Sequence, residues 1–162
     1  MKRRACERVG FSFTLIQKEA SITEEELIQT IEELNTNPQI HGIIVQSPIP
    51  GHMNYQHVIE HIDPKKDVDG FTPYRIGNLF LGESEGIISC TPKGIKRMLD
   101  YYHIDISGKN ITILGRSNIV GKPLSLLLAN AGGTITLCNS KTKDLAQFTK
   151  NADIVIVATG KK

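Results

Sequence analysis

The 162-residue chain contains no tryptophan, few aromatic residues (6%) and only three cysteines. The cysteines (Cys6, Cys90 and Cys138) lie far apart and outside any Cys-x-x-Cys spacing, so we expect neither a disulfide framework nor a cysteine-based metal site. No apolar run approaches the roughly 20 residues that a membrane span needs. The basic start, Met1–Arg4, is not followed by the apolar core of a signal peptide. These absences favour a cytoplasmic protein with reduced thiols.

A large excess of one charge is also missing, because 19 Lys and Arg oppose 17 Asp and Glu for a net charge of +2. Apart from Lys2–Arg4 there is no basic block, so we expect no nucleic-acid partner and no membrane partner. The hydrophobic content of 40% is ordinary for a globular protein. The length suits one domain or two small ones.

The first hundred residues mix helical and strand-like patterns. Thr23 followed by Glu26 is a capping box that predicts the start of a helix. The β-branched run at 40–45 predicts a short buried strand, which the two prolines of Gln46–Gly51 must end. A second helix is expected after Asn54, and a long irregular loop is expected over 63–89. Thr91, as cap, then opens another helix with Pro92 in its first turn.

The pattern changes after residue 103, where we predict a domain boundary between 1–103 and 104–162. Strands are expected at 110–114, 134–138 and 153–158, with helices at 122–131 and 142–152. This βαβαβ order is half of a doubly wound α/β sheet, a Rossmann-like fold. Because such a sheet normally has more strands, we expect the chain to be incomplete at its end, with Ile154–Val157 partly exposed.

A glycine-containing turn, Gly115–Pro123, joins the first of these strands to its helix. Such a turn is where a dinucleotide pyrophosphate binds, on backbone N–H groups and the helix dipole. The glycine spacing is G-x5-G, which differs from the generic G-x-G-x-x-G fingerprint. A tight strand-to-helix turn without a ligand therefore remains the alternative at this point.

The end of the second strand bears on the choice of cofactor. NAD sites usually carry a carboxylate there for the ribose hydroxyl, but Leu137–Lys141 has none. Arg116, Ser140 and Lys141 instead offer cations and a hydroxyl, which suit a 2′-phosphate. The chemistry favours NADP.

Polar residues of the first half supply further candidates. Gln46 follows the expected strand, and Asp67 and Asp69 lie in the long loop, where ligand groups collect in open α/β folds. Each also has a structural alternative, since Gln46 could cap its own turn and the aspartates could form an Asx-turn before Gly70. Pro64–Lys66 is interpreted as a solvated turn.

Two other residue pairs are interpreted as structural. His57 and His61 are four apart on a helix, but without a third ligand they favour a surface pair over a metal site, so no metal is expected. Cys90 and Cys138 are interpreted as small buried residues.

Four segments together resemble the successive signatures of the tetrahydrofolate dehydrogenase/cyclohydrolase family, in that family's order and spacing. They are Gly42–Pro50, Lys66–Phe71, Cys90–Gly94 and Gly115–Pro123. The resemblance extends over essentially the whole chain. It implies an N-terminal α/β folate-binding domain followed by a Rossmann-like NADP-binding domain. It also implies two reactions of one-carbon metabolism: NADP-dependent oxidation of 5,10-methylenetetrahydrofolate, and hydrolysis of the methenyl product to 10-formyltetrahydrofolate.

The resemblance also implies site residues. Lys2–Gly10 is similar to the helix that carries the family's catalytic lysine, which places that lysine at Lys2 and its expected tyrosine before Met1. Gln46 corresponds to the glutamine that hydrogen-bonds this lysine, and Asp69 to the aspartate that holds the pterin ring. A lysine kept in a dry site is easily held neutral and can act as a base toward water. The cofactor-binding residues are expected to be Gly115, Arg116, Ser117, Ile119, Val120, Gly121, Pro123, Ser140, Lys141, Thr159 and Gly160.

One motif departs from the family, which usually has His-Ser where this chain has Asn139-Ser140. The family implies tetrahydrofolate derivatives as ligands and a homodimer as the assembly. Because both ends look incomplete, we expect the chain by itself to be poorly active. The alternative function is a non-catalytic nucleotide- or folate-binding remnant, and a dehydrogenase without the second activity is a lesser variant that Lys2 and Gln46 disfavour.

Overall fold

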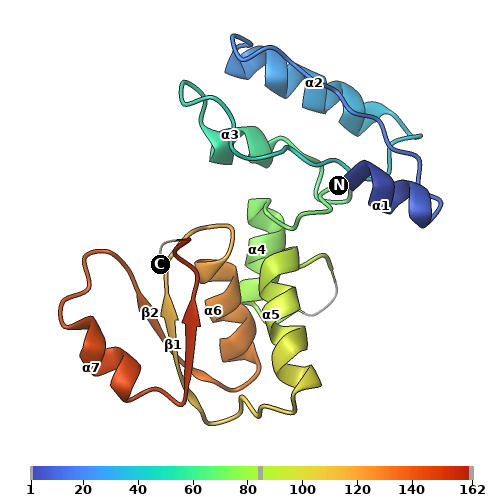
Figure 1. Cartoon of the computed structure of the whole chain (residues 1–162). Helices are drawn as coiled ribbons and strands as arrows, with labels where there is room; N and C mark the ends of the chain where they lie inside the picture. The colour runs from blue at the N-terminus through green and yellow to red at the C-terminus, as the bar shows by residue number, and fades with distance from the viewer. Residues whose placement is uncertain (1, 84–85, 161–162) are drawn as a thin grey trace.

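The computed structural model describes residues 2–83 and 86–160, which form two lobes (Figure 1). The elements in chain order are α1 Lys2–Arg8, α2 Glu24–Thr36, α3 Tyr55–Glu60, α4 Pro73–Phe80, α5 Cys90–Tyr101, β1 Asn110–Leu114, α6 Gly121–Asn130, β2 Thr134–Cys138, α7 Leu145–Lys150 and β3 Ile154–Val157. Within the described residues, none of the helices is both long and apolar enough to cross a bilayer.

The first lobe is built on α2 and α3, which pack through their apolar faces. The capping box at the start of α2 is confirmed, because Thr23 Oγ1 accepts from Glu26 N–H and Glu26 accepts from Thr23 N–H. Asn54 caps α3 as expected. The buried residues of this core are Ile31, Ile43, Val58, Ile59 and Ile62.

The prediction of a strand at 40–45 is wrong. Only Ile43 forms a β-bridge, a parallel one to Asp67, in which Ile43 N–H donates to the Lys66 carbonyl at 2.8 Å. A β-branched run becomes a strand only when a neighbouring strand completes its hydrogen bonds. Here the described neighbour is the turn that contains Asp67, so the segment is extended without forming a sheet.

The long loop predicted at 63–89 contains the helix α4, which was missed. Thr72 Oγ1 accepts from Arg75 N–H and Pro73 occupies the first turn. This is the same Thr-Pro signal that was recognised at Thr91 and Pro92. At that second place the helix α5 begins earlier, at Cys90, so Thr91 is not its cap.

Lys66 is also not in a solvated turn. Its Nζ donates to the carbonyls of Leu34, Asn35 and Asn37 at 2.9, 2.6 and 2.8 Å, and thereby caps the C-terminal end of α2. A cation is favourable at this negative end of a helix dipole. The lysine therefore ties the loop that carries Asp67 and Asp69 to the helix core.

The second lobe contains a parallel sheet of order β2-β1-β3, which confirms the expected βαβαβ pattern. One face of the sheet packs against α6, and α5 packs against α6 and contributes to the same second core (Figure 1). The buried residues of that core are Leu99, Ile106, Ile111, Ile113, Leu124 and Leu128. The four residues of β3 are all at least partly exposed, as expected, with Val155 at 43% and Val157 at 62%.

Candidate functional site

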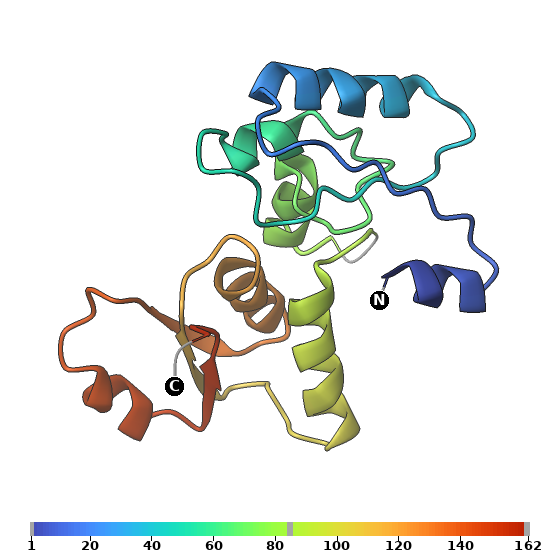
Figure 2. The same ribbon diagram turned by 45° about the horizontal axis from the view of Figure 1, so that its top comes forward.

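A cleft of about 380 Å³ lies where the two lobes meet. Figure 2 shows the beginning of α1 close to the beginning of α5, and both contribute to the cleft. The residues that line it are Lys2, Val45, Gln46, Ser47, Tyr55, Asp69, Phe71, Ser89, Cys90, Thr91 and Ile119. The cleft therefore collects segments that are far apart in the sequence.

The three residues that sequence reasoning assigned to catalysis line this one cleft. Lys2 comes from α1, Gln46 from the extended segment after Ile43, and Asp69 from the loop before α4. Lys2 and Gln46 are exposed and Asp69 is half-buried, so the dry surroundings expected for Lys2 are absent from this structure. The Gln46 amide donates to the Ser47 carbonyl at 2.8 Å, which is the self-capping alternative.

Asp67 builds the turn that holds Asp69. Asp67 is 1% exposed, and its carboxylate accepts from the backbone N–H groups of Asp69, Gly70 and Thr72 at 3.2, 2.7 and 2.8 Å. The Asx-turn alternative thus holds for Asp67, whereas Asp69 lines the cleft. Gly70 has φ +72°, and a Cβ there would lie 2.7 Å from the Ile87 carbonyl oxygen. Only glycine fits this turn.

The electrostatics of the cleft centre on Asp69. Burial raises the pKa of the Asp69 carboxyl above its ordinary value, the positive charge of Lys2 opposes this, and Asp67 adds to it. Burial also raises the pKa of the Tyr55 phenol, with smaller contributions from Asp69 and Asp67. Lys2 is therefore close enough to influence the carboxyl, and the phenol stays neutral at physiological pH because its ordinary value is about 10.

The carboxyl ends of β1, β2 and β3 meet at one edge of the sheet, beside the start of α6 (Figure 1). Gly115 has φ +116°, and a Cβ there would lie 2.6 Å from the Ala158 carbonyl oxygen. A Cβ on Gly121 would lie 1.9 Å from the Gly115 oxygen. Both glycines are therefore needed for the chain to turn back from the strand into α6.

The turn leaves the start of α6 without a side-chain cap, although Ser117 Oγ accepts from Val120 N–H at 3.1 Å. Lys122 N–H donates to the Ser117 carbonyl and Pro123 has no N–H, so among the described residues Gly121 offers the N–H at the start of α6 that suits a phosphate. Pro123 is buried in the first turn of α6. Ile119, in the turn before α6, lines the cleft.

The polar residues proposed for the 2′-phosphate lie at the same edge. Arg116 follows β1, while Ser140 and Lys141 follow the neighbouring strand β2, and all three are exposed. Asn139 is occupied locally, since its side chain accepts from Lys141 N–H at 3.0 Å. Thr159 and Gly160 follow β3 at this edge, with Gly160 at φ +63°. This donor set fits a dinucleotide that carries an additional phosphate.

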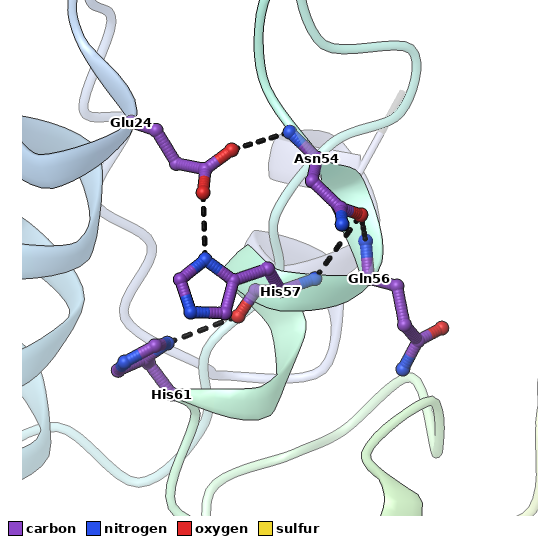
Figure 3. Close-up of polar contacts among 5 residues, drawn as sticks. All are labelled: Glu24, Asn54, Gln56, His57 and His61. Carbon is purple, nitrogen blue, oxygen red and sulfur yellow. Dashed lines mark hydrogen bonds and ion pairs between the residues drawn. The ribbon is translucent and has the colours of Figure 1, made fainter.

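The histidine pair takes part in a structural cluster (Figure 3). Glu24 accepts from Asn54 N–H, and its other oxygen lies 2.6 Å from His57 Nδ1. His61 Nδ1 lies 2.9 Å from the His57 carbonyl oxygen. The contact with His57 is the main cause that lowers the pKa of the Glu24 carboxyl. The cluster ties the start of α2 to α3, and within the described residues no group of three or more His, Cys, Asp or Glu could hold a metal.

Sequence reasoning missed several residues that line the cleft. Tyr55 lies in the helix expected after Asn54 and Ser89 at the end of the loop expected over 63–89, and neither was a candidate site residue. Cys90 was expected to be buried but is exposed, whereas Cys138 is buried as expected. Phe71 and Thr91 lie within the family motifs, but nothing in the local sequence placed them on a cleft, because the position of a side chain on a cleft depends on how the lobes meet.

Comparison with known proteins identifies the family. The sequence model of the tetrahydrofolate dehydrogenase/cyclohydrolase catalytic domain matches residues 1–69, and that of the same family's NAD(P)-binding domain matches residues 89–162. The chain belongs to the tetrahydrofolate dehydrogenase/cyclohydrolase family. The bifunctional protein FolD of Brevibacillus brevis, a member of this family, is 49% identical over 160 residues, which cover 99% of this chain and 56% of that protein.

Solved structures of tetrahydrofolate dehydrogenase/cyclohydrolases agree. The bifunctional enzyme FolD from Campylobacter jejuni superposes with a TM-score of 0.94 at 44% identity, covering 98% of this chain and 56% of that one. The Trypanosoma brucei enzyme, solved with NADP cofactor and inhibitor, has a TM-score of 0.92 at 34% identity, covering 99% of this chain and 55% of that one. The chain thus spans about half the length of the relatives that it matches.

Proposed function

We propose that the protein carrying this sequence oxidises 5,10-methylenetetrahydrofolate with NADP+ and hydrolyses the resulting methenyl compound to 10-formyltetrahydrofolate. The observation that carries the proposal is the single cleft lined by Lys2, Gln46 and Asp69. These side chains come from three separate segments, and the family resemblance implies a catalytic or ligand-binding role for each. Ile119, from the turn before α6, also lines this cleft. The cleft therefore adjoins the nucleotide edge, which is the edge of the sheet at the carboxyl ends of β1, β2 and β3.

The proposed role of Asp69 is to hold the pterin ring. A carboxylate accepts two parallel hydrogen bonds from paired N–H donors such as those on a pterin edge. The Asp67 turn orients Asp69 by holding its backbone, so little ordering remains to be done when the ligand binds. Tyr55 and Phe71 supply apolar surface beside it.

The proposed role of Lys2 is to assist the attack of water on the methenyl carbon, with Gln46 as its hydrogen-bond partner. Lys2 is exposed in this structure, so its site becomes dry only when the folate covers the cleft. Gln46 would then exchange its bond to the Ser47 carbonyl for one to the lysine. A neutral amine close to the reacting carbon can accept a proton from the water.

The proposed cofactor is NADP. When bound, it supplies the hydride acceptor for the oxidation. The backbone N–H groups of Ser117 and Gly121 would bind the phosphates. Gly115 and Val120 would shape the turn, because their N–H groups already donate to the Cys138 carbonyl and to Ser117 Oγ, and Arg116, Ser140 and Lys141 would bind the 2′-phosphate. Ile119, Pro123, Thr159 and Gly160 would complete the binding edge.

We further propose a division into a folate-binding unit, 1–103, and a nucleotide-binding unit, 104–162, with α5 as the helix that links them. Cys90 at its start lines the cleft, whereas Leu99 near its end packs in the core beneath the sheet. A homodimer, which the family resemblance implies, and a cytoplasmic location, which the cysteine pattern favours, complete the proposal. Sedimentation of the purified protein tests the dimer.

The test is an assay of both reactions with the whole protein that carries this sequence. NADPH formation from 5,10-methylenetetrahydrofolate follows the first reaction, and loss of the methenyl compound follows the second. We expect both, with NADP+ preferred over NAD+. Binding of both ligands without either reaction would contradict the proposal and leave the non-catalytic alternative.

A further inference from the structure

The hydroxyl of Ser89 joins the cleft to the turn before α6. Ser89 is 2% exposed and stands directly before α5. Its Oγ donates to the Ile119 carbonyl at 3.1 Å, across 30 residues of sequence. Both residues line the cleft, and Ile119 also belongs to the glycine-containing turn at the nucleotide edge.

The Ser89 hydroxyl does not make the capping hydrogen bond that its position at the start of α5 predicts. A serine at the start of a helix normally accepts a hydrogen bond from an N–H two or three residues later. Ser89 occupies the N-cap of α5 without such a bond, although its carbonyl still accepts from Lys93 N–H at 3.0 Å. Its hydroxyl is therefore free to bind another segment, and it binds the nucleotide turn.

Each end of this bond is in contact with ligand-binding residues. On the folate side, a Cβ on Gly70 would lie 3.0 Å from Ser89 N, so the backbone before α5 packs against the turn that follows Asp69. On the nucleotide side, Ile119 precedes Val120, whose N–H donates to Ser117 Oγ. A continuous series of contacts thus leads from the Asp69 turn through Ser89 to the start of α6.

We propose that Ser89 is a positioning residue that couples folate binding in the cleft to NADP+ binding at the sheet edge. The inference rests on the proposed function, because it takes these two ligands as the occupants. A ligand on either side restricts its own turn, and the Ser89 bond transmits that restriction to the other turn. The second ligand then meets a site that is already ordered, so the coupling is favourable and equal in both directions.

The experiment measures affinity in the whole protein with tetrahydrofolate, which lacks the one-carbon unit and so does not react with NADP+. Each ligand is titrated with and without the other. We expect each to bind roughly five-fold or more tightly in the presence of the other. In Ser89→Ala this ratio falls to about one. The affinity for each ligand alone changes less, because the bond that is lost joins two segments of the protein and is not a contact with either ligand.

Ser125→Ala is the matched control. Ser125 Oγ donates to the Lys122 carbonyl at 2.7 Å within α6, so the substitution removes the same kind of bond without separating two segments. Its coupling ratio should equal that of the unmodified protein. Because the ratio compares two affinities of one variant, a general loss of stability does not change it.

A ratio of about one in the unmodified protein, or an unchanged ratio in Ser89→Ala, would overturn the inference while leaving the proposed function intact. Failure of either ligand to bind would overturn the proposed function and the inference with it. If Ser89→Ala does not fold, Ser89→Cys keeps the volume and weakens the donor. It must then lower the ratio for the inference to stand.

Discussion

The residues of the cleft differ in how directly they face solvent, and this decides what each can do. Asp67 is buried and uses both carboxylate oxygens within its turn, whereas Asp69, two residues later, lines the cleft. Two identical side chains thus have separate roles, one structural and one available to a ligand. Lys2, at the open side, is exposed and free to meet a substrate.

Replacement of Lys2 by methionine should separate the two activities. The change removes the group proposed to assist the attack of water, so methenyl hydrolysis in the whole protein should fall roughly 100-fold or more. Hydride transfer depends more on positioning than on a base and should fall less than about ten-fold. Arg4→Met, on the same helix, is the control. Unchanged hydrolysis in Lys2→Met would refute the role of this lysine.

Replacement of Arg116 by alanine should weaken NADP+ far more than NAD+. The guanidinium lies at the edge where a 2′-phosphate would bind, and loss of a charge-assisted bond costs roughly ten- to 100-fold in affinity. NAD+ lacks that phosphate and should be affected little. Titration of both cofactors into Arg116→Ala, with the distant Arg97→Ala alongside, measures the difference. Equal losses for the two cofactors would be the opposite of what we expect.

Among the elements, the termini of α2 depend on residues that are distant in sequence. Lys66 caps its C-terminal end, and the cluster of Glu24, Asn54 and His57 ties its N-terminal end to α3. The loop with Asp67 and Asp69 is therefore held by α2 as well as by its own turn. A substitution that destabilises α2 should therefore also loosen the loop that places Asp69 on the cleft.

Replacement of Lys66 by methionine should destabilise the protein by about 1–2 kcal/mol, because three carbonyls at the end of α2 lose a charged donor. Lys65→Met is the matched control, since Lys65 is the exposed neighbour and its side chain has no such bonds in the structure. Denaturant unfolding compares the two variants. A loss in Lys65→Met as large as that in Lys66→Met would show that the cap contributes little.

Replacement of Glu24 by glutamine should reduce the dependence of stability on acid pH. The contact with His57 lowers the pKa of Glu24 in the folded state below its ordinary value of 4.5. The unfolded chain therefore binds more protons in this range, and the stabilisation is present above about pH 4.5 and lost as pH falls through the folded pKa.

Urea midpoints near neutral pH and at about pH 3 test this linkage. The unmodified protein and the control Glu25→Gln should lose more stability between these conditions than Glu24→Gln. Parallel losses in all three proteins would mean that the Glu24 contact does not contribute.

At the scale of the whole molecule, the two lobes share the cleft while each keeps its own core. The sheet is covered on one face by α6, with α5 packed behind it, and Val155 and Val157 are exposed on β3 at the edge of the described sheet. Exposed apolar residues on an edge strand promote association between molecules.

In the 162-residue chain itself, the double substitution Val155→Thr and Val157→Thr should lower concentration-dependent association. Threonine keeps the β-branched shape that suits a strand, so the melting temperature should change little. Light scattering across a dilution series measures the association. Threonine in place of Ile111 and Ile113 should instead unfold the lobe, because those two side chains are buried in its core. Undiminished scattering in the double variant would mean that another surface causes the association.

The sequence alone determined the features that depend on local spacing. The capping box at Thr23, the strands β1, β2 and β3, and the order βαβαβ follow from neighbouring residues and from short hydrophobic periods. The motif segments, in order, also identified the family before any fold was known. These predictions succeed because the interactions that decide them lie within a few residues of one another.

Only the tertiary structure decided which residues meet. The run at 40–45 has strand-like residues but no neighbouring strand among those described, so it pairs through Ile43 alone. Lys66 is a helix cap because α2 ends beside it, and Ser89 binds Ile119 because the lobes bring them together. The convergence of Lys2, Gln46 and Asp69 has the same origin. Such contacts join segments tens of residues apart, and their geometry is set by how the two cores pack, which local propensity does not encode.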